Sequence, residues 1–564
     1  MKRRTFLKGA TALGLSCSGL PQLCFGRRIR KKGRKVLVLG LDGMDPRLVR
    51  RFIKEGIMPN TLRLAKKGGL RDLGTSFPPQ SPVAWSNFIA GGNSSVHGIY
   101  DFIHRDPKSR QPYFSTSRVD APENSLNIGN WRLPLSEGSV ASLRRGGCFW
   151  DDLLAQDVPC RIFKMPTNFP SPSSSGLLSV SGMGTPDLAG GYGSYSVLTS
   201  VPESFSKAKT GRVIELGIKS GRADSIIYGP TNTLRSDAKE TSCPITIWRD
   251  ATKSIVRLLI GENELLLQEG EWSGWLPLSF PLVGDLYSVS GIVKLYVKSV
   301  HPELTIYVSP VNVDPANPAL PVVSPISYGR ELVQNVGYFY TQGFPEDTKA
   351  LSEGVLDDRE YLDLAWQVLE ERNRLLEYEL EKFSGSKEGL LFFYYSSLDQ
   401  DSHMYYRLLD KRHPLYDPGL LERYGNIIRK LYLAMDEVIA KVMGSFDPED
   451  PQNLLLVMSD HGFSSFRRQV NLNTWLYDRG YLALEQGARP DSPEFFENVR
   501  WSKTSAYNLG INSIYLNREG RENDGAVSDS ESSKVRKALR DDLLSMRDRQ
   551  CSELAVSQVH VVPE

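Results

Sequence analysis

The sequence predicts an α/β fold in which helices cover a β-sheet with parallel strands. Continuous apolar runs at residues 36–41, 390–395 and 454–458 are typical of strands buried in such a sheet. A Leu- and Glu-rich segment, from about Tyr361 to Phe383, has a helical pattern and lies between the first two runs. Buried strands that alternate with helices indicate an α/β sheet, and such sheets bind ligands at the carboxyl ends of their strands.

The composition is that of a globular protein. Of the 564 residues, 40% are hydrophobic and 24% are charged, which excludes wholesale disorder. The net charge is only +2, but residues 1–35 contain eleven Lys or Arg and no acidic residue. The rest of the chain therefore has nine more acidic than basic side chains, which disfavours a nucleic-acid-binding scaffold.

The basic N-terminus predicts an export signal over residues 1–26. Lys2-Arg3-Arg4-Thr5-Phe6-Leu7-Lys8 precedes a moderately apolar, uncharged stretch that ends in small residues. The paired arginines are similar to a twin-arginine signal, so we expect the twin-arginine export machinery as a partner and a periplasmic or secreted protein. Lipid attachment at Cys17 and an ordinary basic tail are the less favoured alternatives. Beyond the signal, no stretch is long and apolar enough to span a bilayer.

Three parts follow the signal. The first run ends at Asp42-Gly43, and Pro46 begins a helix, so residues 27–230 are expected to form the first part of the α/β core. Residues 231–325 are predicted to be a β-rich insertion, because the runs Ile255–Ile260, Glu264–Gln268, Leu286–Val297 and Leu304–Ser309 are short and β-like. Its last residues, 310–325, contain five prolines and are expected to be a linker. Residues 326–564 complete the core.

Four cysteines remain after the signal: Cys148, Cys160, Cys243 and Cys551. They have no CxxC spacing, which disfavours a zinc ribbon. One or two disulfides could form in an oxidising compartment, and the sequence does not specify the pairing.

Metal-ligand side chains follow the three apolar runs. Asp42 follows the first, Asp399 and His403 the second, and Asp460 and His461 the third. Carboxylate and imidazole together suit zinc or a similar divalent ion. A single aspartate there could equally be a helix cap or turn residue. Three such ends at one sheet edge favour a metal site.

Ser81 is a candidate nucleophile. It comes just before a predicted helix over Ala84–Ala90, which Gly91-Gly92 could end. Free backbone N–H groups at a helix start favour phosphate binding, although a serine at this place is more often a cap. A metal would make its hydroxyl a usable nucleophile near neutral pH.

Taken in order, these motifs resemble a known family. They are Leu39-Gly40-Leu41-Asp42-Gly43, Met58-Pro59-Asn60, the segment from Ser81 to Gly91, His97-Gly98-Ile99-Tyr100-Asp101-Phe102, Asp399-x3-His403 and Ser459-Asp460-His461-Gly462-Phe463. The set is similar to the alkaline phosphatase superfamily, and within it to the type I phosphodiesterase/nucleotide pyrophosphatase branch, over about residues 35–230 and from 330 to the end. The resemblance implies an alkaline-phosphatase-like three-layer α/β/α sandwich, here with a β-rich insertion.

The resemblance also implies a site for two divalent metal ions, most typically Zn²⁺. Asp42, Asp460, His461 and the oxygen of the nucleophile Ser81 would hold one ion. Asp399 and His403 would hold the other, with a further C-terminal histidine. That histidine is not found before Glu564, so a C-terminal truncation is one interpretation. Phe102 stands where nucleotide-hydrolysing members have an asparagine that contacts phosphoryl oxygens.

These features predict a metal-dependent hydrolase of small phosphate esters, most simply of diesters. One alternative is an exported binding protein that is non-catalytic or holds one metal on the same fold. A sulfatase-like hydrolase is the other alternative. It is disfavoured because Pro82 directly follows Ser81 and Trp85 stands in place of the arginine that sulfatases need.

Overall fold

A computed structural model of the chain describes residues 33–561, apart from 121, 137, 285 and 491–495. The predicted export signal over residues 1–26 therefore lies outside the described residues. Within them, no helix is long and apolar enough to cross a membrane.

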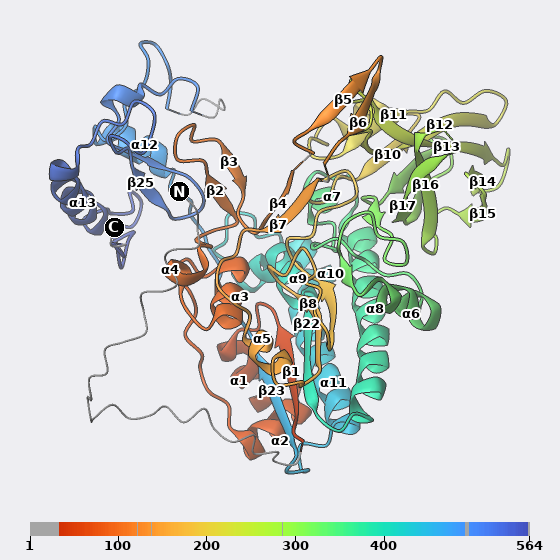
Figure 1. Cartoon of the computed structure of the whole chain (residues 1–564), viewed down its shortest axis with the longest axis horizontal. Helices are drawn as coiled ribbons and strands as arrows, with labels where there is room; N and C mark the ends of the chain where they lie inside the picture. Colours follow the sequence, from red (N-terminus) through yellow and green to blue (C-terminus); the bar gives the residue numbers. More distant parts are fainter. Residues whose placement is uncertain (1–32, 121, 137, 285, 491–495, 562–564) are drawn as a thin grey trace, which may run out of the picture.

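A six-stranded sheet forms the centre of the molecule (Figure 1). Neighbouring strands pair in parallel, except for one antiparallel strand at an edge, β21. In spatial order the strands are β21 (Val323–Ser324), β9 (Leu177–Ser181), β8 (Cys160–Met165), β22 (Gly389–Tyr395), β1 (Lys35–Leu41) and β23 (Asn453–Met458). The three predicted apolar runs are thus neighbours, which brings their carboxyl ends together.

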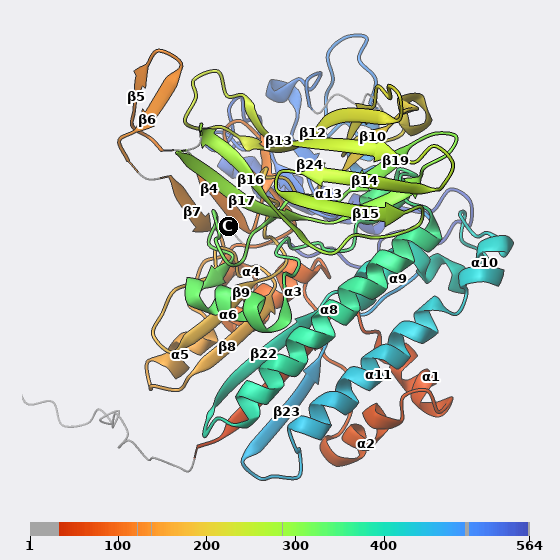
Figure 2. The ribbon, with the colours of Figure 1, turned by 90° about the vertical axis from the view of Figure 1, so that its right-hand side faces the viewer.

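Helices cover both faces of this sheet. Alternate residues of β1 point to opposite sides: Leu37 and Leu39 pack into the larger core, and Val38 into a second, smaller one. One face carries α1 (Pro46–Lys54), α2 (Pro59–Gly68), α8 (Asp358–Ser384) and α11 (Ile427–Ser445), and Figure 2 shows α8 and α11 running along it. The other carries α3 (Ser81–Ala90) and α5 (Phe149–Leu154). The predicted three-layer α/β/α arrangement is confirmed.

Three local expectations need correction. Leu454 and Leu456 are largely exposed, because β23 is an edge strand and is not buried on both faces. Residues 310–325 do more than link, since they contain β20 (Asn312–Val313) and the edge strand β21. The run 286–297 divides between β17 (Tyr287–Val293) and β18 (Leu295–Ser299), which belong to different sheets.

A β-rich region lies beyond the carboxyl ends of the central strands (Figure 2). Its largest sheets are four-stranded and its residues join the main hydrophobic core. One sheet contains β10 (Ser196–Thr199), β11 (Arg212–Glu215), β18 and β19 (Thr305–Val308), and another β12 (Arg222–Thr231), β13 (Glu240–Arg249), β14 (Ile255–Ile260) and β15 (Asn263–Gln268). A third contains β16 (Leu276–Val283), β17 and β20.

The smaller elements are short helices and two-stranded hairpins. The helices are α4 (Ser94–His97), α6 (Ile326–Val336), α7 (Thr348–Ser352), α9 (Ser397–Tyr405) and α10 (Pro418–Tyr424). The hairpins pair β2 (Ile103–Arg105) with β3 (Pro112–Phe114), β4 (Ser117–Asp120) with β7 (Ser139–Ser142), and β5 (Ser125–Ile128) with β6 (Trp131–Pro134). Near the end of the described chain, α12 (Leu472–Asp478), α13 (Asp529–Leu544), β24 (Ala506–Asn508) and β25 (Ile514–Leu516) surround a small core of their own.

The four cysteines Cys148, Cys160, Cys243 and Cys551 are all free thiols in this structure. Cys160 and Cys243 are buried, and burial raises the pKa of both thiols, so these two are chemically quiet core residues.

Candidate metal and phosphate-ester site

The ends of β1, β22 and β23 bring four of the predicted side chains together. Asp42 directly follows β1, Asp399 lies in the first turn of α9 after β22, and Asp460 and His461 follow β23. Ligand atoms of Asp42, Asp460 and His461 all lie within 4.8 Å of one another. His461 Nε2 is 3.7 Å from Asp399 Oδ1, so the fourth residue borders the same space.

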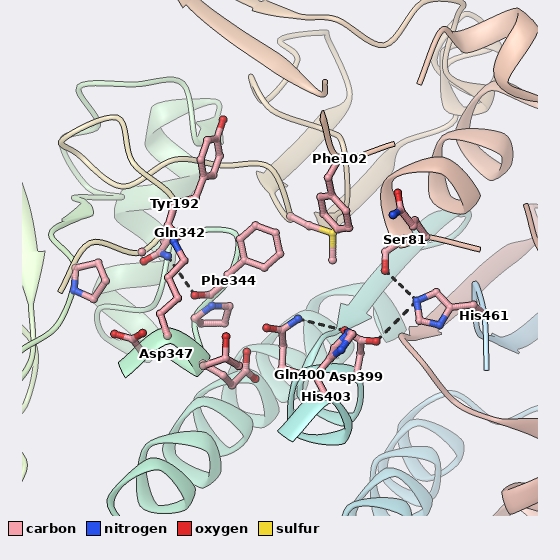
Figure 3. A pocket seen from close by; sticks show the side chains of 18 of the residues that line it. Ser81, Phe102, Tyr192, Gln342, Phe344, Asp347, Asp399, Gln400, His403 and His461 are labelled. Carbon is pink, nitrogen blue, oxygen red and sulfur yellow. Dashed lines mark hydrogen bonds and ion pairs between the residues drawn. The ribbon is translucent and has the colours of Figure 1, made fainter. Parts of the chain in front are cut away.

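Ser81 faces this cluster. Its Oγ lies 3.2 Å from Asp42 Oδ1 and 3.1 Å from His461 Nε2. Figure 3 shows Ser81 and His461 pointing toward each other from α3 and from the end of β23, and Asp399 approaching the same ring nitrogen of His461 as Ser81 does. The hydroxyl is thus placed at the edge of the candidate metal cluster, where a bound cation could polarise it.

The start of α3 differs from the expectation in two ways. The helix begins at Ser81 itself, and Gln80 is the N-cap. Several free backbone N–H groups were expected there, but Pro82 has none, and the N–H groups of Val83 and Ala84 donate to the Gln80 carbonyl. The first turn of the helix therefore offers a phosphate little more than the N–H of Ser81.

His403 lies farther out. Its Nε2 is 3.5 Å from Asp399 Oδ2, and its side chain is 57% exposed. Asp399 Oδ2 also accepts a hydrogen bond of 3.2 Å from Gln400 Nε2. Asp399 therefore contacts His461 through one carboxylate oxygen and His403 through the other.

The electrostatics of the cluster favour a cation. Burial raises the pKa of Asp42 well above its ordinary value, and the charges of Asp460 and Asp399 raise it further. Burial likewise raises the pKa of Asp460. Burial alone would lower the pKa of His461, but the surrounding carboxylates outweigh it and raise the pKa to about 9.

Two buried carboxylate oxygens in the cluster have no hydrogen-bond partner within the described chain: Asp399 Oδ1 and Asp460 Oδ2. Buried carboxylate oxygens without a hydrogen bond are costly, and their contacts with His461 Nε2 are long, at 3.7 Å from Asp399 Oδ1 and 3.5 Å from Asp460 Oδ2. A divalent cation would satisfy both oxygens. The donor set, three carboxylates and an imidazole, matches the ligands that zinc accepts. The residues present therefore fit a metal of the expected kind.

Gly43 allows the strand ends to approach. It has a φ of +68°, and a Cβ at this position would lie 2.9 Å from Asp399 Oδ1. Its N–H donates to Asp460 Oδ1 at 3.3 Å. A glycine after Asp42 is needed because the chain turns sharply there while the acidic residue of the neighbouring strand end packs against it.

Two residues that support the site were not predicted from the sequence to be site residues. Trp85 Nε1 and the Tyr394 hydroxyl both donate to Asp42 Oδ2, at 3.0 and 2.5 Å. This leaves Asp42 Oδ1 directed toward Ser81 and His461. The spacing of Ser81 and Trp85, four residues along a helix, is a sequence signal that they share a face. No comparable sequence signal identifies Tyr394, because the apolar run around it predicts only a buried residue of a strand.

A cavity of about 480 Å³ opens beside Ser81. Asp399, His403 and His461 line one end, and Phe102, Tyr192, Gln342 and Phe344 line the rest with other residues (Figure 3). The site thus consists of a metal-ligand cluster, a hydroxyl and a space for a small molecule.

Comparison with known protein families identifies this arrangement. Residues 36–225 and 331–564 match the family described as Type I phosphodiesterase / nucleotide pyrophosphatase. This chain belongs to that family. The family is part of the alkaline phosphatase superfamily, so the predicted resemblance and fold class are confirmed.

Membership in the type I phosphodiesterase family makes the chain a phosphate-ester hydrolase by class and favours that class over a sulfatase. Family members are generally metal-dependent, in keeping with the cluster around Asp42. No match is found among curated proteins or among solved structures.

Proposed function

We propose that this chain hydrolyses phosphodiesters with Ser81 as its nucleophile, at a site for two divalent cations, preferably Zn²⁺. The observation that carries the proposal is the position of Ser81 Oγ, within 3.2 Å of both Asp42 Oδ1 and His461 Nε2. Among the described residues, Ser81 has the hydroxyl that contacts both side chains, whereas the Tyr394 hydroxyl donates to Asp42 alone. The chain's family hydrolyses esters of this kind.

The proposed ligands fall into two groups. Asp42, Asp460, His461 and the Ser81 oxygen would hold one cation, and Asp399 and His403 would contribute to the other. When bound, such cations lower the pKa of a coordinated hydroxyl and neutralise charge on the phosphoryl oxygens. The two buried carboxylate oxygens that have no hydrogen bond, on Asp399 and Asp460, support this assignment.

The reaction follows from the position of the serine. Ser81 Oγ gives up its proton to solvent and attacks phosphorus, and the bond from phosphorus to one ester oxygen breaks. The departing alkoxide takes up a proton from solvent as it leaves. Water then attacks the phosphoserine ester, which releases a phosphate monoester and regenerates the hydroxyl of Ser81. Trp85 and Tyr394 hold Asp42 in position throughout.

Replacement of the nucleophile tests the proposal. Ser81→Ala should lower kcat for bis(p-nitrophenyl) phosphate by at least 10³-fold while its metal content, measured by elemental analysis, changes little. Ser86→Ala is a matched control, since Ser86 lies on the same helix and its hydroxyl contacts Thr167 instead. Full activity of Ser81→Ala would overturn the assignment.

We also propose export by the twin-arginine route, on the sequence of residues 2–8. Fusion of residues 1–35 to a fluorescent protein should direct it out of a bacterial cytoplasm. Replacement of Arg3 and Arg4 by lysines should retain the fusion inside the cell. Export of that variant at the original rate would contradict the proposal.

A further inference from the structure

The cavity beside Ser81 has an apolar wall, which we define as Phe102, Met183, Phe344 and Ile511. The rings of Phe102 and Phe344 have their centroids 6.2 Å apart, and Figure 3 shows both residues between Ser81 and Tyr192. Met183 is almost fully buried, whereas Ile511 is 62% exposed. An exposed isoleucine that lines the same cavity as two phenylalanine rings is part of an incomplete apolar surface that a ligand could cover.

Four separate segments of the chain build this wall. Phe102 precedes β2, Met183 follows β9, Phe344 precedes α7, and Ile511 lies in the loop between β24 and β25. Convergence of four segments on one side of the cavity gives the wall a fixed shape, because each residue is anchored in a different part of the fold.

Asp101 joins two of these segments. One carboxylate oxygen accepts a hydrogen bond from the backbone N–H of Phe102 at 2.6 Å, and the other accepts from the N–H of Ile511 at 2.8 Å. Asp101 is buried, and the two segments are 410 residues apart in sequence. Gly510 makes the contact possible, since its φ is +81° and a Cβ there would lie 2.3 Å from Asp101 Oδ2. Asp101 thus positions Ile511 next to Phe102.

The charges that line the cavity do not suit a second anionic group. Among its described lining residues, the one Lys or Arg is Lys349, and its Nζ donates to the Tyr192 carbonyl at 2.6 Å. Glu346 and Asp347 line the same part of the cavity. A second phosphate group placed there would face the two carboxylates of Glu346 and Asp347 against the single positive charge of Lys349, so the balance of charge is unfavourable.

We infer that the site selects a phosphodiester with an uncharged, apolar ester group and discriminates against substrates that carry a further anionic group, such as nucleoside triphosphates. The inference rests on the proposed function, because it concerns the second substituent of the phosphate that Ser81 attacks. The apolar wall would bind that substituent, which would cover the exposed side chain of Ile511.

A series of chromogenic diesters tests this preference. p-Nitrophenyl butyl phosphate should be hydrolysed with a kcat/KM at least tenfold above that of p-nitrophenyl methyl phosphate, since each buried methylene contributes up to about fourfold. The 3-carboxypropyl ester has nearly the same length but ends in a charge, and it should lose this gain. ATP should be the poorest substrate of the set.

Substitutions in the apolar wall test whether these residues cause the preference for the butyl ester. Ile511→Ser and Phe344→Ala should each lower the butyl-to-methyl ratio of kcat/KM at least threefold. Leu266→Ser is a matched control, because Leu266 is similarly exposed but lies on β15, outside the cavity lining. Asp101→Asn should raise KM for the butyl ester more than it changes kcat, as expected of a positioning residue, and its Tm reports whether the fold is retained.

A binding measurement does not depend on turnover. The zinc-loaded Ser81→Ala variant should bind dibutyl phosphate at least tenfold more tightly than dimethyl phosphate by calorimetry. Hydrolysis of bis(p-nitrophenyl) phosphate without a preference for butyl over methyl, or with equal use of the carboxypropyl ester or ATP, overturns the inference and leaves the proposed function intact. If the metal-loaded wild-type protein hydrolyses none of the diesters, the proposed function fails and the inference fails with it.

Discussion

Trp85 Nε1 donates a 3.0 Å hydrogen bond to Asp42 Oδ2, which joins the helix that carries Ser81 to the strand end that carries the central carboxylate. Tyr394 donates to the same oxygen from the neighbouring strand. The site is therefore braced from two sides of Asp42. Groups that hold a metal ligand through its second atom typically contribute 10- to 100-fold to metal affinity or activity.

The first prediction concerns this brace. Trp85→Phe keeps a buried ring but removes the donor, so zinc affinity should fall about 10- to 100-fold. Activity should fall at limiting zinc and recover when zinc is in excess. Competition with a fluorescent chelator measures the affinity, and Trp475→Phe, in the separate C-terminal core, is the control. Unchanged affinity would mean that Asp42 needs no support from the indole.

The second prediction concerns charge repulsion in the cluster. Asp42, Asp399 and Asp460 are buried close together, and without a cation their charges oppose one another. Asp460→Asn should therefore raise the Tm of the metal-free protein, because it removes one of the three charges. The same change should abolish most of the gain in Tm that zinc gives the wild type, since one ligand is lost.

Calorimetry of both proteins, with and without zinc, checks this pair of effects. Asp541→Asn is a suitable control because Asp541 is exposed on α13, far along the chain from the cluster. A lower Tm for metal-free Asp460→Asn would show that hydrogen bonds such as the one from Gly43 N–H outweigh the repulsion.

The third prediction concerns the attachment of the C-terminal core to the β2–β3 hairpin. Arg105 and Glu522 form an ion pair of 2.7 Å with both side chains almost fully buried. The Arg105 guanidinium also lies 4.0 Å from the ring centroid of Tyr515. Glu522 also has an ion pair of 2.9 Å with Arg521, which remains when Arg105 is replaced. Arg105→Met should therefore cost about 1.5–3 kcal/mol, as expected for the loss of a hydrogen bond to a charged group.

Thermal unfolding and limited proteolysis of residues 471–561 check this cost. Arg222→Met is the matched control, since the Arg222–Asp224 pair has a similar distance of 2.9 Å but is largely exposed. Exposed pairs contribute little, so that variant should unfold like the wild type. Equal effects of the two substitutions would contradict the importance of burial.

Much of the fold was predictable because the central strands are continuous apolar runs. β1 and β22 match the predicted segments to within one residue, and α8 extends the predicted helix by only a few residues at its start and one at its end. The polar residues that follow these strands were predictable for the same reason, since parallel strands end at one edge. The hydrophobic pattern did not identify β8, because its sequence CRIFKM mixes charged and apolar residues. Its Lys164 is nevertheless buried, and donates to the Tyr340 carbonyl.

The support of the site depends on strand register, which a single sequence does not specify. Gly40 pairs with Tyr394, and a Cβ at Gly40 would lie 2.8 Å from the indole of Trp85. The missing side chain on one strand thus makes room for a tryptophan on a helix, so that both donors reach Asp42. The apolar wall of the cavity could not be predicted from the sequence either, because Phe102 and Ile511 are far apart in the chain and are joined by hydrogen bonds to Asp101.

The last prediction concerns pH and Asp347, which lines the cavity away from the metal ligands. Burial raises the pKa of this carboxyl to about 6, although the N–H of Ala350 and the Tyr307 hydroxyl donate to it. In the unfolded chain the pKa returns to about 3.9. Between these two values the folded protein holds the proton more tightly, so the contribution of Asp347 to stability falls as the pH rises from about 4 to 6 and stays low above that.

Asp347→Asn removes this pH dependence. Its amide oxygen can still accept from Ala350, and the Tyr307 hydroxyl can turn to accept from its amide nitrogen. The stability of Asp347→Asn relative to wild type should therefore rise by up to about 3 kcal/mol between pH 4 and pH 8. Tm values for both proteins at several pH values measure the difference. If the stability difference between the two proteins were constant across that range, the pKa of Asp347 would be the same in the folded and unfolded chain. If the difference decreased with pH, the pKa of Asp347 would be lowered by folding and not raised.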